Sequence, residues 1–176
     1  MKKKNIVLIG FMGSGKTTVG IRLSYRMRKS IEDTDKLIER REKRTIREIF
    51  AQDGEEHFRK LETEMLRDAV AKLKNQIISV GGGTPIKEEN RKLLKQLGMV
   101  VYFRVKPETV CKRLKHDTAR PLLQCENPMD KVTELLEQRK EAYEACADII
   151  IDVKKMKKKQ RTNWKCLGTI KNKKKL

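Results

Sequence analysis

GFMGSGKTTVG, residues 10–20, is the stretch that decides the fold, and it follows directly on the apolar run NIVLI at residues 5–9. From Gly10 it has the spacing G-x-x-x-x-G-K-T, in which glycines let backbone N–H groups wrap a phosphate chain. Lys16 can reach the β- and γ-phosphates of a nucleotide, and the Thr17 hydroxyl can ligate Mg²⁺. The pattern therefore predicts a nucleoside triphosphate site formed by Gly13, Ser14, Gly15, Lys16, Thr17 and Thr18.

The residues on either side of this loop argue against a chance match. A glycine-rich turn could carry the spacing by accident, but here an apolar, β-branched run precedes it and the helix-compatible segment TVGIRLSYRMRK, residues 18–29, follows. A helix that begins there points its positive end at the bound anion. We therefore expect the loop to join a strand to a helix.

Length and hydropathy place the chain among single-domain cytoplasmic proteins. Its 176 residues fit one domain with a core of its own. No apolar run approaches the roughly 20 residues that a membrane helix needs. The start, MKKKN, is basic, but the apolar run that follows is too short for the core of a secretory signal. We expect a cytoplasmic protein with no membrane partner.

The formal net charge of +19 is concentrated at one end of the chain. Residues 154–176 carry eleven Lys or Arg and no acidic residue, whereas residues 1–153 hold all 24 Asp and Glu. We therefore expect a domain over residues 1–153, moderately basic as suits anionic substrates, and a solvated, largely disordered Lys-rich tail over residues 154–176.

Apolar runs alternate with longer stretches of helical period. Helical spacing is clearest over residues 58–74 and 129–146. Strands that alternate with helices imply a parallel sheet covered on both faces, with ligands at the carboxyl ends of its strands. The predicted class is therefore α/β, with a central five-stranded parallel sheet flanked by helices. Its strands are expected at residues 5–9, 76–80, 99–105 and 147–153, with a weaker fifth around residues 30–32.

Two carboxylates are placed for metal binding and proton transfer. The run IISVGGGTP, residues 77–85, brings no carboxylate to the end of its strand, so the acidic partner of the metal must come from elsewhere. Asp33 and Asp35 follow the weak strand; one could steady the metal and the other accept a hydroxyl proton. The alternative is that Asp33 or Thr34 only caps the helix that begins near residue 35.

The glycines at residues 81–83 and the pair Arg59 and Glu62 can each be interpreted as part of a functional site or as an ordinary structural feature. Gly81, Gly82 and Gly83 let the backbone approach a flat or crowded group, but they could equally form an ordinary strand-to-helix turn. Arg59 and Glu62 share a helix face, so that the glutamate could hold the guanidinium in position. Taken alone, a surface ion pair is the commoner arrangement.

Seven motifs follow one another along residues 5–153: GFMGSGKTTVG, DTD, IREIF, GEEHFR-x-x-E, VGGGTP, RPLL and R-x-x-x-Y-x-x-x-AD. With these motifs in this order, the chain resembles the shikimate kinase family. The resemblance implies a P-loop kinase fold with a mobile lid. It also implies transfer of the γ-phosphoryl group of ATP to a hydroxyl of shikimate, which gives shikimate 3-phosphate and ADP in aromatic amino acid biosynthesis.

The resemblance also implies roles for single residues. Lys16 and the loop hold the phosphates, and Thr17 and Asp33 serve the Mg²⁺ ion. Asp35 binds the substrate hydroxyl and acts as the base. The catalytic set is then Asp35, Lys16 and Arg120. ATP is contacted in addition by Arg113, near the adenine, and by Arg120. The substrate is bound by Asp35, Arg59, Gly81, Gly82, Gly83 and Arg139, with both arginines on its carboxylate.

Physical chemistry supports this division of roles. A carboxylate in a partly dry pocket calls for arginine, whose planar fork donates two parallel hydrogen bonds. The lid, about residues 115–130, has the polar and proline-rich composition of a hinged loop, and its Arg120 would reach the phosphates on closure. Arg139 taken alone would read as an exposed helix arginine beside Glu134, Glu137 and Glu141.

Residues 154–176 depart from the family pattern, which continues with a loop beside the adenine and a last amphipathic helix. We therefore expect ATP affinity to suffer before phosphoryl transfer does.

The rival functions are a P-loop kinase for gluconate or a nucleoside monophosphate, and a basic nucleic-acid-binding protein, although aromatic side chains for base stacking are scarce. A catalytically dead relative ranks low, because every charged residue named above is present. The expected partners are ATP and shikimate, with no specific nucleic acid, and the expected state is a monomer.

Overall fold

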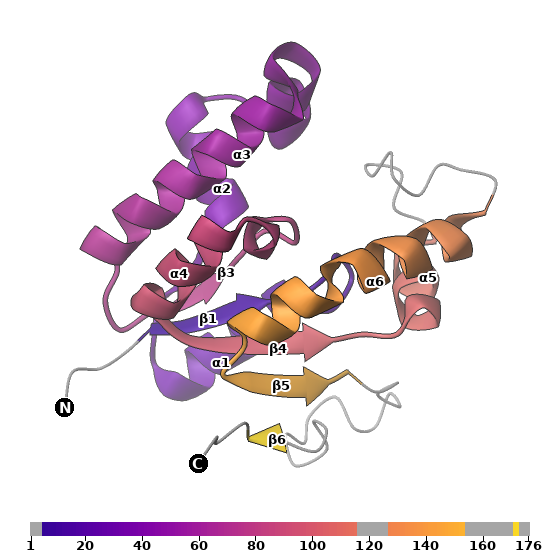
Figure 1. Ribbon diagram of the computed structural model, residues 1–176. Helices are drawn as coiled ribbons and strands as arrows, with labels where there is room; N and C mark the ends of the chain where they lie inside the picture. The colour runs from indigo at the N-terminus through magenta and orange to yellow at the C-terminus, as the bar shows by residue number, and fades with distance from the viewer. Residues whose placement is uncertain (1–4, 116–126, 154–170, 173–176) are drawn as a thin grey trace.

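The computed structural model describes residues 5–115, 127–153 and 171–172, which are built around one sheet (Figure 1). Its strands lie in the order β2-β3-β1-β4-β5-β6, and the first five in chain order pair in parallel. The predicted five-stranded parallel sheet is therefore confirmed, including its weak second strand. The bounds are β1 Asn5–Ile9, β2 Ile31–Asp33, β3 Ile77–Ser79, β4 Gly98–Arg104 and β5 Ile149–Asp152.

The apolar run of β1 is explained by its position at the centre of the sheet. Val7 pairs with Ile78 of β3 on one side and with Val100 of β4 on the other. Successive side chains point to opposite faces, and helices cover both, so every residue of β1 is buried. A strand in this position reads as an unbroken apolar run rather than as an alternating one.

Helices cover the two faces unequally (Figure 1). On one face α1 packs on Ile6, Leu8 and Phe103 through its half-buried Val19 and Leu23. On the other face lie residues of α3, α4 and α6. The bounds are α1 Lys16–Met27, α2 Thr34–Glu42, α3 Ile46–Lys72, α4 Glu88–Leu97, α5 Pro107–Leu114 and α6 Pro128–Cys146, with a short 3₁₀ helix η1 at Thr84–Ile86.

The helix predicted from residue 58 begins twelve residues earlier, at Ile46. Thr45 caps it through a capping box with Glu48, in which each side chain bonds the other residue's backbone N–H. The helix is kinked at Gly54, whose φ of 80° and ψ of 175° are open to glycine alone among the common residues. Because the kink breaks the helical period, the sequence pattern indicated only the second half.

The carboxyl ends of the parallel strands gather the candidate residues at one edge of the sheet. The phosphate loop follows β1, Asp33 ends β2, and the glycine triplet follows β3. Since β1 lies between β3 and β4, these segments are neighbours. Such an edge is where open parallel sheets bind ligands.

Beyond residue 153 the structure describes one further strand, β6 (Lys171–Asn172), which pairs antiparallel with Ile149 and Ile150 of β5. The remaining residues of the predicted tail lie outside the described residues, so its solvated and largely disordered state stays a prediction. Most of the predicted lid, residues 116–126 with Arg120, lies outside the described residues, and Pro128–Asp130 at its end belong to α6. Among the described residues no helix is long and apolar enough to cross a membrane.

Candidate active site

The phosphate loop connects β1 directly to the first turn of α1. Gly10 has a φ of 145°, and a methyl group on it would lie 2.7 Å from the carbonyl oxygen of Phe103. Gly15 caps α1 in the left-handed region, with a φ of 95°. Glycine is therefore needed at both positions. The Nζ atom of Lys16 donates to the carbonyl oxygens of Gly10 (2.7 Å) and Phe11 (3.2 Å), so the ammonium group lies against the loop.

Besides Lys16 and the glycines, four more of the predicted nucleotide contacts lie on or beside this loop: Ser14, Thr17, Thr18 and Arg113. The side chain of Ser14 is buried, and its Oγ has no hydrogen-bond partner among the described residues. Thr17 and Thr18 lie in the first turn of α1 and are exposed. Arg113, on α5, donates from Nη1 to the carbonyl oxygen of Gly13 (2.7 Å). The loop thus offers a buried hydroxyl, exposed hydroxyls and cations around one helix N-terminus, which suits an anion.

Asp33 caps α2 while it ends β2. Its Oδ1 atom accepts a hydrogen bond from the backbone N–H of Asp35 (3.1 Å), so the capping interpretation of the sequence applies to Asp33. The cap occupies one carboxylate oxygen and leaves Asp33 a second one. Among the described residues, no group of three or more His, Cys, Asp or Glu side chains is arranged to hold a metal ion. A metal here would therefore depend on Asp33, Thr17 and phosphate oxygens.

Asp35 has the electrostatic environment of a general base. Burial raises the pKa of its carboxyl group from 3.8 to about 6, with further increases from the negative charges of Asp33 and Glu62; Lys16 opposes the shift. The buried Oδ1 atom of Asp35 has no hydrogen-bond partner among the described residues. A buried carboxylate with a pKa near neutrality and an unpaired oxygen is suited to accept a proton from a bound hydroxyl.

The glycine triplet makes room for two of the predicted site residues. A methyl group on Gly81 would lie 2.6 Å from Oδ1 of Asp35, and one on Gly83 would lie 2.7 Å from the guanidinium carbon of Arg59. At Gly82 the nearest atom would be the carbonyl oxygen of Gly10, at an ordinary 3.5 Å. At two of the three glycines, the group that comes close to the backbone is therefore a side chain of the protein itself, Asp35 or Arg59.

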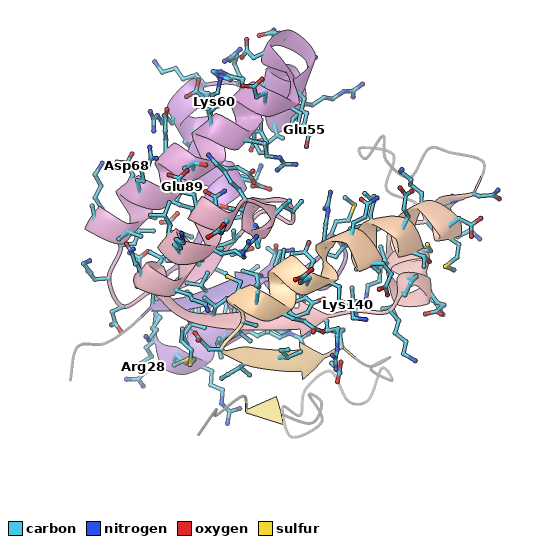
Figure 2. The ribbon with its side chains drawn as sticks, in the orientation of Figure 1. Arg28, Glu55, Lys60, Asp68, Glu89 and Lys140 are labelled. Carbon is cyan, nitrogen blue, oxygen red and sulfur yellow. The ribbon has the colours of Figure 1, made fainter. Side chains whose placement is uncertain are left out.

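Arg59 is fixed by carboxylates on its own helix. Its Nη1 atom donates to Oε2 of Glu62 (2.7 Å), and its Nη2 atom donates to Oε1 of Glu55 (2.7 Å). Figure 2 shows Glu55 on α3. Glu62 is 3% exposed, and its Oε1 atom accepts a short hydrogen bond from the Thr84 hydroxyl. The plain reading as a surface ion pair is therefore wrong: Glu62 is a buried anchor that directs the half-buried guanidinium of Arg59 toward the glycine triplet.

Arg139 is not an exposed helix arginine. It lies on α6 with its guanidinium carbon 5.4 Å from the centre of the Phe11 ring, a cation–π distance. Tyr143 lies one turn further along α6. Both Arg59 and Arg139 lower the pKa of Tyr143 through their charge, against the larger effect of burial, which raises it to about 12. The two arginines therefore converge on the same region from α3 and α6.

Sequence reasoning missed the residues that hold this set in place. The Thr84 hydroxyl donates a hydrogen bond to Glu62, 22 positions away, and the Tyr143 hydroxyl donates one to Gly82, 61 positions away. Glu55, which accepts a hydrogen bond from Arg59, was given no role. The signals for Tyr143 were its place in the motif R-x-x-x-Y-x-x-x-AD and its spacing of four from Arg139, which places both on one helix face. Arg120 lies outside the described residues. Of the other predicted residues, Arg59, Arg113 and Arg139 come from α3, α5 and α6, and the rest lie on the loop, in the first turns of α1 and α2 or at the neighbouring strand ends.

A cavity of about 1320 Å³ lies to one side of this set, lined by residues of β4, β5, α5 and α6. Arg113 lines it and also bonds Gly13 of the phosphate loop. Asp35, Arg59 and Arg139 do not line it. Arg113 therefore connects this cavity to the phosphate loop, and the cavity is separate from Asp35, Arg59 and Arg139.

Sequence comparison identifies a family over most of the chain. The family model described as shikimate kinase matches residues 12–167. A shikimate kinase of Moorella thermoacetica is 48% identical over 148 residues, which cover 84% of each chain. A shikimate kinase of Thermodesulfovibrio yellowstonii is 44% identical over 149 residues, which cover 85% of each chain.

Solved structures agree with the sequence comparison. Shikimate kinase from Acinetobacter baumannii in complex with shikimate superposes with a TM-score of 0.81 and 38% identity, covering 90% of this chain and 87% of that one. A gluconokinase from Sinorhizobium meliloti reaches a TM-score of 0.51 at 17% identity, over 88% of this chain and 85% of that one, and so shares the fold alone. The P-loop kinase fold is thereby confirmed, and the chain belongs to the shikimate kinase family.

Proposed function

We propose that this protein transfers the γ-phosphoryl group of ATP to a hydroxyl group of shikimate, which yields shikimate 3-phosphate and ADP. The observation that carries the proposal is the meeting of an acid–base carboxylate and an anchored arginine at the glycine triplet. There a methyl group on Gly81 would collide with Asp35, and one on Gly83 with Arg59. Membership of the family and likeness to a relative that binds shikimate support it.

The carboxylate of the substrate would be held by Arg59 and Arg139. Glu62 and Glu55 fix the first guanidinium, and the second lies over the ring of Phe11. A guanidinium that is already oriented loses little entropy when it forms paired hydrogen bonds with a carboxylate. Gly81, Gly82 and Gly83 would line the ring between the arginines and Asp35, because glycines there let the side chains of Asp35 and Arg59 lie close to the backbone.

Asp35 would bind the reacting hydroxyl and take its proton. With a pKa of about 6 it is largely ionised at neutral pH and can still act as a base. The transition state of phosphoryl transfer is loose, so little proton removal is required until late, and orientation of the hydroxyl is the larger part of the task. The buried and unpaired Oδ1 atom of Asp35 suits that contact.

The phosphates of ATP would lie on the loop between β1 and α1. Lys16, Ser14 and the backbone N–H groups of Gly13 and Gly15 supply positive charge and hydrogen bonds there, and Thr18 lies in the same helical turn. Thr17 and Asp33 would hold the Mg²⁺ ion, which neutralises charge on the phosphate oxygens when bound.

Two further arginines would complete the nucleotide site. Arg113 is joined to the loop through Gly13 and borders the large cavity, which places it on the adenine side of the loop. Arg120 would reach the phosphates when the lid closes and would neutralise charge on the transferring group.

A substrate panel tests the proposal. ADP release from Mg²⁺-ATP is measured with shikimate, with gluconate, with nucleoside monophosphates and with no acceptor. We expect release to depend on shikimate and to be lost in Asp35→Asn and strongly weakened in Arg59→Ala, while both variants keep the parent's circular dichroism spectrum. Equal turnover with gluconate or a nucleotide, or parental activity in both variants, would contradict the proposal.

A further inference from the structure

The hydroxyl of Thr84 supports Arg59 from a second element of the fold. Thr84 begins η1, directly after the glycine triplet, and is 1% exposed. Its hydroxyl donates a short hydrogen bond to Oε1 of Glu62, while the other carboxylate oxygen, Oε2, accepts from Nη1 of Arg59 (2.7 Å). Each oxygen of this buried carboxylate therefore has a partner, and the two contacts together fix the rotation of the group.

Thr84 is itself held in place by its backbone. Its N–H donates to the carbonyl oxygen of Gly81 (3.3 Å), and its own carbonyl oxygen accepts from Nδ2 of Asn90 (3.0 Å), a buried residue of α4. A methyl group on Gly81 would lie 3.0 Å from the Thr84 hydroxyl oxygen and 3.0 Å from Oε1 of Glu62. The hydroxyl therefore has a fixed place beside the glycine triplet.

The two carboxylates that bind Arg59 differ in exposure. The side chain of Glu55 is 65% exposed, so water and salt weaken its ion pair, whereas that of Glu62 is 2% exposed. In a buried pair little water is present to replace a lost contact, so the direction of each charged group matters more. The orientation of Arg59 therefore depends chiefly on Glu62.

The bonds to the two glutamates leave Arg59 donors for a ligand. Its guanidinium has five N–H groups, and three of them donate to Glu55 or Glu62, from Nε, Nη1 and Nη2. The other two, one on each Nη atom, make no hydrogen bond within the described part of the chain. A carboxylate can accept from two such N–H groups at once.

We propose that Thr84 is a positioning residue for the acid substrate: its hydroxyl holds the Glu62 carboxylate in the orientation that directs Arg59, and so sets the affinity for the substrate carboxylate. The inference rests on the proposed function. An arginine side chain has many rotamers, and an anchor that selects one of them before binding lowers the entropy lost on binding. The anchor does so only while its own carboxylate cannot turn.

The alternative is that the Thr84 hydroxyl only satisfies a buried carboxylate and so serves the fold. Thr84→Val separates the two interpretations, because it deletes the hydroxyl and keeps the shape of the side chain. If Thr84 positions Arg59 through Glu62, the KM for shikimate rises about fivefold to tenfold, a size set by one hydrogen bond. The kcat and the KM for ATP stay within about twofold of the parent.

Thr63→Val is the matched control. Thr63 is 3% exposed, lies next to Glu62 on α3, and donates its hydroxyl to the backbone carbonyl oxygen of Arg59 (3.0 Å), not to the carboxylate. The same chemical change is thus made at a second buried threonine near the same arginine. We expect urea denaturation to show a loss of stability in both variants, and the KM for shikimate to change beyond about twofold in T84V alone.

Two further variants test the route of the effect. Thr84→Ser keeps the hydroxyl and should restore the KM of the parent to within about twofold. In an Arg59→Ala background, Thr84→Val has no guanidinium left to misplace, so it should lower kcat/KM for shikimate by less than about twofold. The ratio kcat/KM is compared because it stays measurable when binding is weak.

Several results would overturn the inference. They are a parental KM in T84V, an equal rise in T84S or T63V, a loss confined to kcat, an undiminished effect of T84V without Arg59, and a T84V chain that no longer folds. Failure of the proposed function is distinguishable, because the parent itself would then release no ADP in response to shikimate, and the inference would fall with it.

Discussion

Gly83→Ala should weaken substrate binding without harming the fold. Gly83 has a φ of −89° and a ψ of −20°, a conformation that alanine adopts readily. The added methyl group would lie 2.7 Å from the guanidinium carbon of Arg59, whereas ordinary contacts of such a group begin near 3.4 Å. The Nη1 atom of Arg59 would lie closer still, so the guanidinium must retreat by roughly 1 Å or turn away from the glycine triplet.

The size of the effect follows from the bonds that Arg59 makes. Moving its guanidinium stretches or breaks the 2.7 Å bond to Glu62 and misplaces the group that would grip the substrate carboxylate. A hydrogen bond to a charged partner contributes about 1.5–3 kcal/mol, which is about a tenfold to hundredfold change in affinity. Stability should fall by part of this contribution, offset by up to about 1 kcal/mol because alanine has less freedom than glycine in the unfolded chain.

Initial rates of ADP release at varied shikimate, together with urea denaturation, measure both quantities. We expect a KM for shikimate about ten to a hundred times that of the parent, and a free energy of unfolding lowered by no more than the ion pair contributes, about 1.5–3 kcal/mol. In an Arg59→Ala background the clash has no partner, so Gly83→Ala should add little. A G83A variant that binds shikimate like the parent, or that costs as much without Arg59, would refute the reasoning.

The remaining predictions concern Asp35. Asp35→Asn should lower kcat by about a hundredfold or more, as loss of a general base does, and a smaller loss in the ADP-release assay would remove Asp35 from that role. In the parent, kcat/KM should fall as pH drops below about 6, where the Asp35 carboxylate takes up a proton; a profile flat down to pH 5 would contradict the raised pKa. Because the pKa of Asp35 is about 6 in the folded protein and 3.8 in the unfolded chain, its ionisation lowers the stability of the folded state above pH 6. Below pH 3.8 the group is protonated in both states and has no such effect. Asp35→Asn should therefore raise the free energy of unfolding at pH 7.5 by up to about 3 kcal/mol and leave it nearly unchanged at pH 4, as urea denaturation would show.

Much of the fold could be predicted because its signals are local. A central parallel strand buried on both faces must be apolar throughout, and the run at residues 5–9 coincides with β1. The helix expected over residues 129–146 is α6 from Pro128 to Cys146. The phosphate loop carries its chemistry in consecutive residues, so a short stretch of sequence was enough to indicate it.

The rest depends on contacts between distant segments. The first half of α3 escaped detection because Gly54 interrupts the helical period. The spacing of Arg59 and Glu62 on one helix predicted their ion pair, but it could not tell that Glu62 is buried, since burial comes from the packing of other elements. The bond from Tyr143 to Gly82 joins elements 61 positions apart, and no spacing along one chain segment encodes it.

The most direct test of the central claim is a crystal structure of the protein with shikimate and a non-hydrolysable ATP analogue. We expect a carboxylate oxygen of Asp35 within about 3.2 Å of the shikimate hydroxyl that faces the γ-phosphate. The guanidinium groups of Arg59 and Arg139 should both lie on the substrate carboxylate. Shikimate bound away from the glycine triplet, or with its carboxylate toward Asp35, would contradict the account.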